Sequence, residues 1–120
     1  MKTITKNSIA GVSCHTWISD KYLDQYAAEC FKKDQRLLEI ELSKFLFKFA
    51  NKNNMIPEKD DKICIFHPKG KPRKDDNAIR SEEFLVTDIE WDFPKKSSND
   101  VRPVIRIFFE YIGWAMQSEF

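Results

Sequence analysis

The sequence is poor in glycine and cysteine, and each shortage argues against a class of protein. Its three glycines lie far apart and form no glycine-rich phosphate-binding motif. Its three cysteines are odd in number and widely spaced, which argues against a disulfide framework and favours a reduced, intracellular protein. No apolar run approaches the roughly 18 residues of a membrane-spanning helix, and the N-terminus lacks a signal-peptide pattern. We therefore expect a cytoplasmic protein with no membrane association.

A charge excess of either sign is also missing. The 20 basic and 19 acidic side chains nearly cancel and leave a formal charge of +1. Nucleic-acid-binding proteins usually carry a basic excess, so any charged partner must meet a local patch on this chain. The apolar content of 42%, with ten phenylalanines, is sufficient for a hydrophobic core. We expect residues 1–120 to form a single globular domain.

The residues that could support catalysis or metal binding have unsuitable spacing. Structural zinc usually takes tightly spaced ligand pairs, whereas the candidates here are Cys14 with His15, Cys30, and Cys64 with His67. Neighbouring residues on a strand, or residues three apart, point to opposite faces. A cysteine nucleophile also needs a histidine and an orienting group around it, and no motif supplies them. We predict no catalytic residue, no metal and no cofactor, and therefore no enzymatic activity.

A long segment with helical periodicity begins near Ser19. Residues 19–52 contain no proline or glycine, Ser19 can cap the start, and Pro57 follows the end. The polar stretch 32–36 leaves open whether this segment is one long helix or two shorter helices. At 100° per residue, the second half places one apolar stripe on a single face. The stripe consists of Leu38, Leu42, Phe45, Leu46 and Phe49.

The same half of the segment carries apolar residues on a second side. Leu37, Ile40 and Phe47 lie away from the main stripe. A helix that is apolar on two sides is usually sandwiched within a core, so we favour burial within the monomer over contact with a second copy. Both a monomer and a homodimer remain compatible with the pattern.

The rest of the chain is strand-like. Residues 62–66 are apolar on both faces, as an internal strand would be. Residues 82–93 and 101–112 alternate between apolar and polar, and the short polar stretch between them predicts an antiparallel hairpin. The alternation places Leu85 on the core side of the first hairpin strand and Val86 on the opposite side. Residues 3–18 alternate loosely and fit either a strand or a short helix. We predict an α+β fold in which the helical segment 19–52 packs on a small antiparallel sheet.

The register of the hairpin follows from pairing like side chains. The pairing that matches apolar residues across the strands also places Asp92 opposite Arg102 and Asp88 opposite Arg106. The acidic row on this strand, which consists of Asp88, Glu90 and Asp92, then forms a surface ion ladder rather than a metal site. Pro103 cannot donate a hydrogen bond to a neighbour, so we expect the second hairpin strand to be an edge strand or bulged there.

Two parts of the hairpin are candidate surfaces for a protein partner. The acidic row would suit a basic cleft on another protein. If the second strand continues to the C-terminus, aromatic residues line the side opposite the hairpin core; a helical tail or burial in the core is the alternative. Tryptophan and methionine are enriched at interfaces. The candidate residues are Asp88, Glu90, Asp92, Phe108, Trp114 and Met116.

A basic loop follows the predicted strand 62–66. Lys69, Lys71, Arg73 and Lys74 could contact phosphates. The loop contains no aromatic residue on which a base could stack, and acidic residues follow it directly. We favour a solvated connection between two strands, with phosphate binding as the alternative.

By elimination, the sequence favours a small non-enzymatic protein-interaction module. Inhibitors and immunity or antitoxin-type proteins, which dock on a larger protein, share its size and lack of motifs. The alternative is a nucleic-acid-associated protein that uses the basic loop 69–74. The identity of the protein partner does not follow from the residues.

Overall fold

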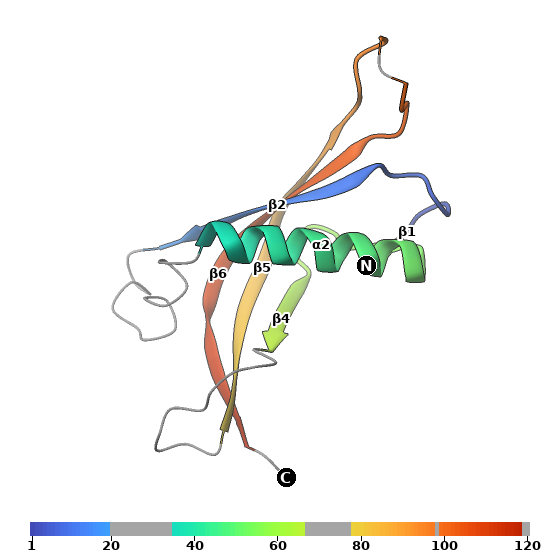
Figure 1. Cartoon of the computed structure of the whole chain (residues 1–120). Helices are drawn as coiled ribbons and strands as arrows, with labels where there is room; N and C mark the ends of the chain where they lie inside the picture. The colour runs from blue at the N-terminus through green and yellow to red at the C-terminus, as the bar shows by residue number, and fades with distance from the viewer. Residues whose placement is uncertain (20–34, 67–77, 98, 119–120) are drawn as a thin grey trace.

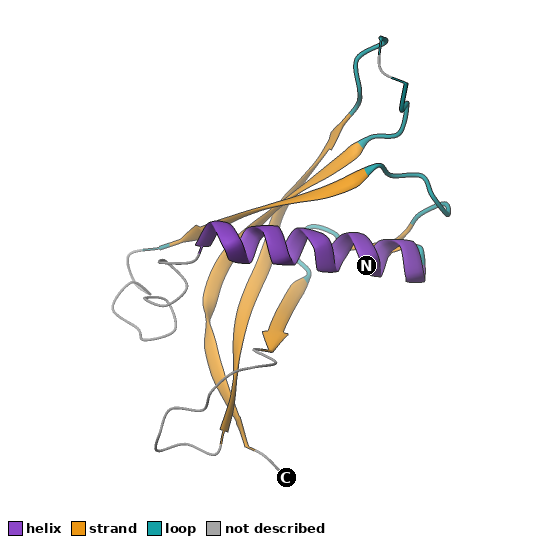
Figure 2. Ribbon diagram, in the orientation of Figure 1, coloured by secondary structure: helices purple, strands orange, loops and turns teal. Residues whose placement is uncertain are grey.

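The computed structural model describes residues 1–19, 35–66, 78–97 and 99–118, and for 65–66, 78–82 and 114–118 it describes the backbone alone. These residues form an α+β fold with one helix beside a sheet (Figures 1 and 2). The fold class is as predicted. The elements are β1 (Lys2–Thr3), β2 (Gly11–Ile18), α2 (Gln35–Asn53), β3 (Met55–Ile56), β4 (Lys62–Phe66), β5 (Ala78–Asp92) and β6 (Val104–Ser118).

The main sheet is mixed rather than antiparallel. Its four strands follow the order β2-β6-β5-β4, and β1 pairs separately with β3. The β4–β5 and β5–β6 pairs are antiparallel, but β2 runs parallel to β6. The prediction of an antiparallel sheet is therefore wrong in one strand pair. The segment 3–18, which fitted either a strand or a helix, supplies that strand.

Helix α2 follows the predicted 3.6-residue periodicity. It buries Leu42, Leu46 and Ala50, which are spaced one turn apart. It ends where Asn54 adopts a left-handed conformation, with φ 53°, and donates its N–H to the Ala50 carbonyl at 2.8 Å. Residues 20–34 of the predicted helical segment lie outside the described residues. No helix in the described part of the chain is both long and apolar enough to cross a membrane.

The buried stripe of α2 is narrower than predicted. Phe45 was placed in the stripe but is 61% exposed, because it lies about 100° around the helix from Leu46. Leu37 and Ile40, which we expected to be buried within the monomer, are 62% and 42% exposed. Phe47 is half-buried against the core. The helix therefore presents apolar side chains to solvent beside its buried face.

The core lies between α2 and one face of the sheet. Phe84 packs edge-to-face against Phe109 and Tyr111, with ring centroids 6.1 and 5.6 Å apart. Such aromatic pairs add stability beyond the apolar area that they bury. The buried cluster consists of Ile9, Cys14, Leu42, Leu46, Ala50, Ile56, Phe84, Val86, Ile105, Ile107, Phe109 and Tyr111.

The β5–β6 hairpin is present, but its register differs from the predicted one. Glu90 lies opposite Arg106 and Asp92 lies opposite Val104, so the strands are shifted by two residues. The pairing is shifted because the loop that connects β5 to β6 is longer than predicted, since β6 begins only at Val104. Pro103 precedes the strand and its carbonyl accepts the N–H of Ala10 at 2.8 Å. β6 pairs with β2 on one side and β5 on the other, so it is an inner strand, and Pro103 lies before it and removes no ladder bond. The predicted edge or bulge at this proline is therefore wrong.

A bulge further along β5 reverses the predicted facing of its side chains. The register shifts between Val86 and Asp88, where one extra residue enters the strand. Val86 therefore turns into the core, although the predicted alternation had placed it outside and Leu85 inside. A second shift, between Glu83 and Phe84, lies opposite Gly113.

Strand β4 was predicted to be internal but is the last strand of the described sheet. Its apolar pattern is misleading because only one of its faces meets the core. Ile63 packs against the core, whereas Cys64 is exposed with its Sγ 3.9 Å from a Glu83 carboxylate oxygen. A small thiol tolerates this position beside a carboxylate.

Candidate functional site

The sheet face turned away from α2 collects aromatic and charged side chains. On β6, residues 105, 107, 109 and 111 face the core, so the residues between them face the other way. In the parallel register, His15 lies beside Phe108 and Trp17 beside Glu110. We call this surface the open face. Its residues are Ser13, His15, Trp17, Asp88, Glu90, Asp92, Arg106, Phe108 and Glu110.

Stacked rings form the centre of the open face. The His15 and Phe108 rings stack with centroids 5.2 Å apart and planes inclined by 22°. The Arg106 guanidinium lies 5.6 Å from the centroid of the Phe108 ring, within cation–π range. Ser13 Oγ is 3.2 Å from His15 Nε2 and holds the imidazole from the other end. Trp17, next along β2, is 60% exposed.

An acidic row borders these rings. Asp88, Glu90 and Asp92 alternate along β5, are all exposed, and share the open face. Asp88 lies directly opposite Phe108 in the antiparallel register. Glu90 Oε2 is 3.6 Å from Arg106 Nη1, which is a long, exposed ion pair that contributes little to stability. Among the described side chains of the open face, carboxylates outnumber cations, so this surface is acidic.

The predicted ion ladder is wrong in both of its pairs. Arg102 binds Asp100 instead of Asp92, with Nη2 and Oδ2 2.9 Å apart. Arg106 pairs with Glu90 instead of Asp88. Both changes follow from the two-residue shift in register. Hydrogen bonds from the Arg102 side chain and backbone lower the pKa of Asp100 to about 2.

The remaining predicted site residues are only partly described. The backbone of Trp114 and Met116 belongs to β6, so the helical tail considered as an alternative is wrong, but their side chains lie outside the described residues. The basic loop with Lys69, Lys71, Arg73 and Lys74 also lies outside the described residues. The structure therefore brings together four of the six predicted partner-binding residues, namely Asp88, Glu90, Asp92 and Phe108.

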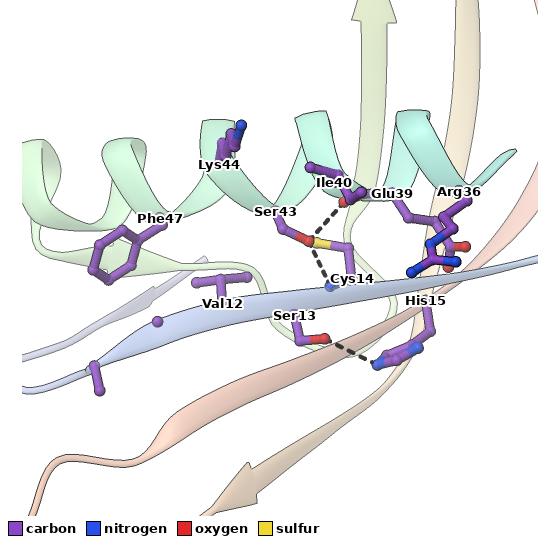
Figure 3. Close-up of a pocket in the computed structure, with 12 residues that line it drawn as sticks. Val12, Ser13, Cys14, His15, Arg36, Glu39, Ile40, Ser43, Lys44 and Phe47 are labelled. Atoms are coloured by element: carbon purple, nitrogen blue, oxygen red, sulfur yellow. Dashed lines mark hydrogen bonds between the residues drawn. The ribbon is translucent and has the colours of Figure 1, made fainter. Parts of the chain in front are cut away.

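A groove of about 580 Å³ lies between α2 and β2 (Figure 3). At the base of the groove, side chains of α2 form hydrogen bonds with the backbone at the outer edge of β2. Ser43 Oγ accepts the N–H of Cys14 at 2.8 Å, and Glu39 Oε2 accepts the N–H of Thr16 at 2.8 Å. Gln35 Nε2 donates to the Thr16 carbonyl at 3.0 Å. Four helical residues rise about 6 Å and two strand residues about 6.6 Å, so the bonding groups of the two elements stay in step.

The wall of the groove formed by α2 combines apolar and basic side chains. Arg36, Ile40 and Lys44 follow one another at single-turn spacing, and Phe47 continues the row beyond them. Figure 3 shows Arg36 and Phe47 extending from the helix toward β2, whereas Lys44 does not extend toward the strand. His15 lines the opposite wall and also belongs to the open face. The groove and the open face are therefore adjacent surfaces.

The cysteine and histidine of the "CH" pair point to different surroundings. Cys14 is buried in the core, and burial raises the pKa of its thiol to about 12. His15 faces the other side of the sheet, against Phe108. In the described part of the chain, no three metal-ligating side chains come together. Cys30 and His67, which completed the zinc set considered above, lie outside the described residues.

The pattern of the sequence did not identify three residues that now stand out. Trp17 follows Ser13 and His15 at strand spacing, and a tryptophan on the polar side of an alternating strand is a usable signal for exposure. Arg36 and Lys44 flank Ile40 at single-turn spacing, which would have marked one basic and apolar ridge. Comparison of the chain with protein-family models, with curated proteins and with solved structures gave no match.

Proposed function

We propose that this chain is a small, non-enzymatic protein-interaction module whose open face docks on a basic surface of a larger protein. Inhibition or immunity-type neutralisation of that protein is the mode of action we favour. The observation that carries the proposal is the position of Trp17, which is 60% exposed on the same face as the acidic row. A large exposed aromatic side chain beside exposed carboxylates is typical of a docking surface.

The physical properties of the open face suit this role. A tryptophan that becomes buried in a partner pocket is among the side chains that contribute most to binding energy. The carboxylates Asp88, Glu90 and Asp92 would speed the encounter with a basic partner and select against acidic ones. His15 and Phe108 are already ordered by stacking, so little side-chain entropy is lost there on binding.

The acidity of the open face weighs against nucleic acid as its ligand. A phosphate backbone would meet Asp88, Glu90 and Asp92 before it reached the rings. The alternative function, nucleic-acid association, therefore depends on the basic loop 69–74. Titration of salt against DNA and RNA binding separates the two functions, because phosphate contacts give a steep salt dependence.

A cytoplasmic location is part of the proposal. Cys14 and Cys64 are both free thiols, one buried and one exposed. Free thiols of this kind persist most readily in a reducing compartment.

Quantitative affinity capture from the cells of origin tests the proposed function. Trp17→Ser removes an exposed aromatic from the open face, and Phe45→Ser removes an equally exposed one from α2. We expect the Trp17 variant to recover the partner with at least about tenfold lower yield and the Phe45 variant to match the wild type. Equal recovery by all three chains, or no stoichiometric protein partner, would contradict the proposal.

A further inference from the structure

We infer that the groove between α2 and β2 is a second binding site, which takes an extended acidic peptide segment with an apolar residue between two carboxylates. The inference does not depend on the open face or on the identity of its partner. It is carried by the charges of the groove, by their spacing along α2, and by the backbone groups at the edge of β2.

The charges of the groove are opposite to those of the open face. Arg36 and Lys44 both line it, and neither makes an ion pair with any residue the structure describes. Glu39 also lines the groove, but one of its oxygens already accepts the Thr16 N–H. A ligand with carboxylates is thus attracted to the groove, and the neighbouring acidic face repels it.

The spacing of the two cations matches an extended chain. Arg36 and Lys44 are eight residues apart, which places them about 12 Å apart along the axis of α2 and about 80° apart around it. In an extended peptide, residues i and i+4 point to the same side and lie roughly 13 Å apart. The residue at i+2 points to that side as well, and it would meet Ile40, which lies midway and is 42% exposed. The pattern that fits is acid-x-apolar-x-acid.

The edge of β2 supplies backbone groups for such a segment. The N–H groups of Cys14 and Thr16 point toward α2, so that of Val12 points to the same edge by the alternation of a strand. One turn beyond Ser43, the helix presents Phe47, which has no hydrogen-bond acceptor for Val12. Gly11 adds no side chain to this wall. Because α2 already binds the edge at Cys14 and Thr16, an extended peptide pairs with β2 only where it continues past Lys44 to Val12.

Fluorescence anisotropy with a labelled peptide tests the inference. The probe is an N-acetylated, C-amidated peptide with the core Glu-Ala-Leu-Ala-Glu, and the comparison probes are Lys-Ala-Leu-Ala-Lys, Glu-Ala-Ser-Ala-Glu and a single-stranded oligonucleotide. We expect saturable binding of the first probe, weaker binding of the serine peptide, and no binding of the lysine peptide. Tighter binding of the oligonucleotide than of the acidic peptide would overturn the inference.

Matched charge reversals on α2 locate the site. Arg36→Glu/Lys44→Glu changes the groove, whereas Lys48→Glu/Lys52→Glu makes the same net change on exposed residues outside it. We expect the first pair to weaken peptide binding about tenfold and the second pair by less than about threefold. Equal losses would assign the binding to the overall charge of α2 and contradict the inference.

Backbone amide shifts distinguish pairing with the edge of β2 from a purely electrostatic contact with α2. In a ¹⁵N-resolved NMR titration, the Val12 amide should shift with the peptide, while the amide of Glu58, on another surface, should not. The same spectra show whether each variant is folded. An unshifted Val12 amide at saturation would rule out pairing with the edge of β2. Since the capture experiment on Trp17 reports on the open face alone, either proposal can fail without the other.

Discussion

The Ser43 hydroxyl accepts the backbone N–H of Cys14 at 2.8 Å and donates to the carbonyl of Glu39 at 2.6 Å. It thereby ties helix α2 to the outer edge of β2, the first strand in the order of the described sheet. Exposed strand edges are prone to pair with other chains, and proteins commonly cover them. Here helical side chains occupy part of that edge and leave the rest to the groove.

Ser43→Ala should destabilise the protein by about 1–3 kcal/mol, because the N–H of the buried residue Cys14 then loses its acceptor. Chemical denaturation gives the free energy of unfolding. Ser97→Ala, on an exposed residue, is the matched control and should change it by less than about 0.5 kcal/mol. Equal effects of the two substitutions would mean that the bond contributes nothing specific.

Gly113→Ala should cost about 1–3 kcal/mol, because Gly113 has φ 126°, a conformation that side chains with a Cβ rarely adopt. Gly11→Ala is its control. A Cβ at Gly11 would meet only Val104 Cγ2, at an ordinary distance of 4.0 Å, so a change below about 1 kcal/mol is expected. Thermal or chemical denaturation compares the two variants. A tolerated Gly113→Ala would contradict the second β5–β6 irregularity.

Much of the fold could be predicted from local patterns, but the pairings between distant segments could not. The periodicity of α2, its end before Asn54 and the existence of the β5–β6 hairpin all follow from neighbouring residues. The parallel pairing of β2 with β6 joins segments from opposite ends of the chain and leaves no local signal. The bulge at Val86 adds a single residue, yet it reverses the facing of Phe84, Leu85 and Val86 relative to the predicted alternation.

The candidate site was predictable to a similar extent. The acidic row was visible because Asp88, Glu90 and Asp92 alternate along one strand. Trp17 was not, because its segment could have been a strand or a helix, and only the parallel pairing places it beside Glu110. The groove could not be predicted for the same reason, since it forms only where β2 packs beside α2.

Cys14 should resist alkylation far longer than Cys64. Burial raises the pKa of Cys14 to about 12, and only the thiolate reacts, whereas Cys64 is exposed. Iodoacetamide labelling followed by peptide mass spectrometry at pH 8 measures both rates. Because the folded pKa of Cys14 is raised, its contribution to stability should persist below pH 9 and be lost as the pH rises toward 12. Comparable labelling of both thiols in the folded chain would contradict the burial of Cys14.

Asp100 should titrate at an unusually low pH. Its pKa is lowered from 3.8 to about 2 by hydrogen bonds from Arg102. The stabilisation that this pair provides is therefore present above about pH 4 and is lost as the pH falls toward 2. NMR titration of the side-chain carboxyl carbon gives the midpoint. Arg102→Ala should return it toward 3.8, and an unchanged midpoint in that variant would show that another group lowers the pKa.

The most direct test of the central claim is carbodiimide footprinting of the carboxylates, free and bound to the partner that the wild-type chain captures. If the open face is the docking surface, labelling of Asp88, Glu90 and Asp92 falls sharply in the complex. Glu41 on α2 and Glu58 after β3, which are exposed elsewhere, should react as in the free chain. Unchanged labelling of the acidic row, with protection of Glu41 or Glu58 instead, would contradict the account.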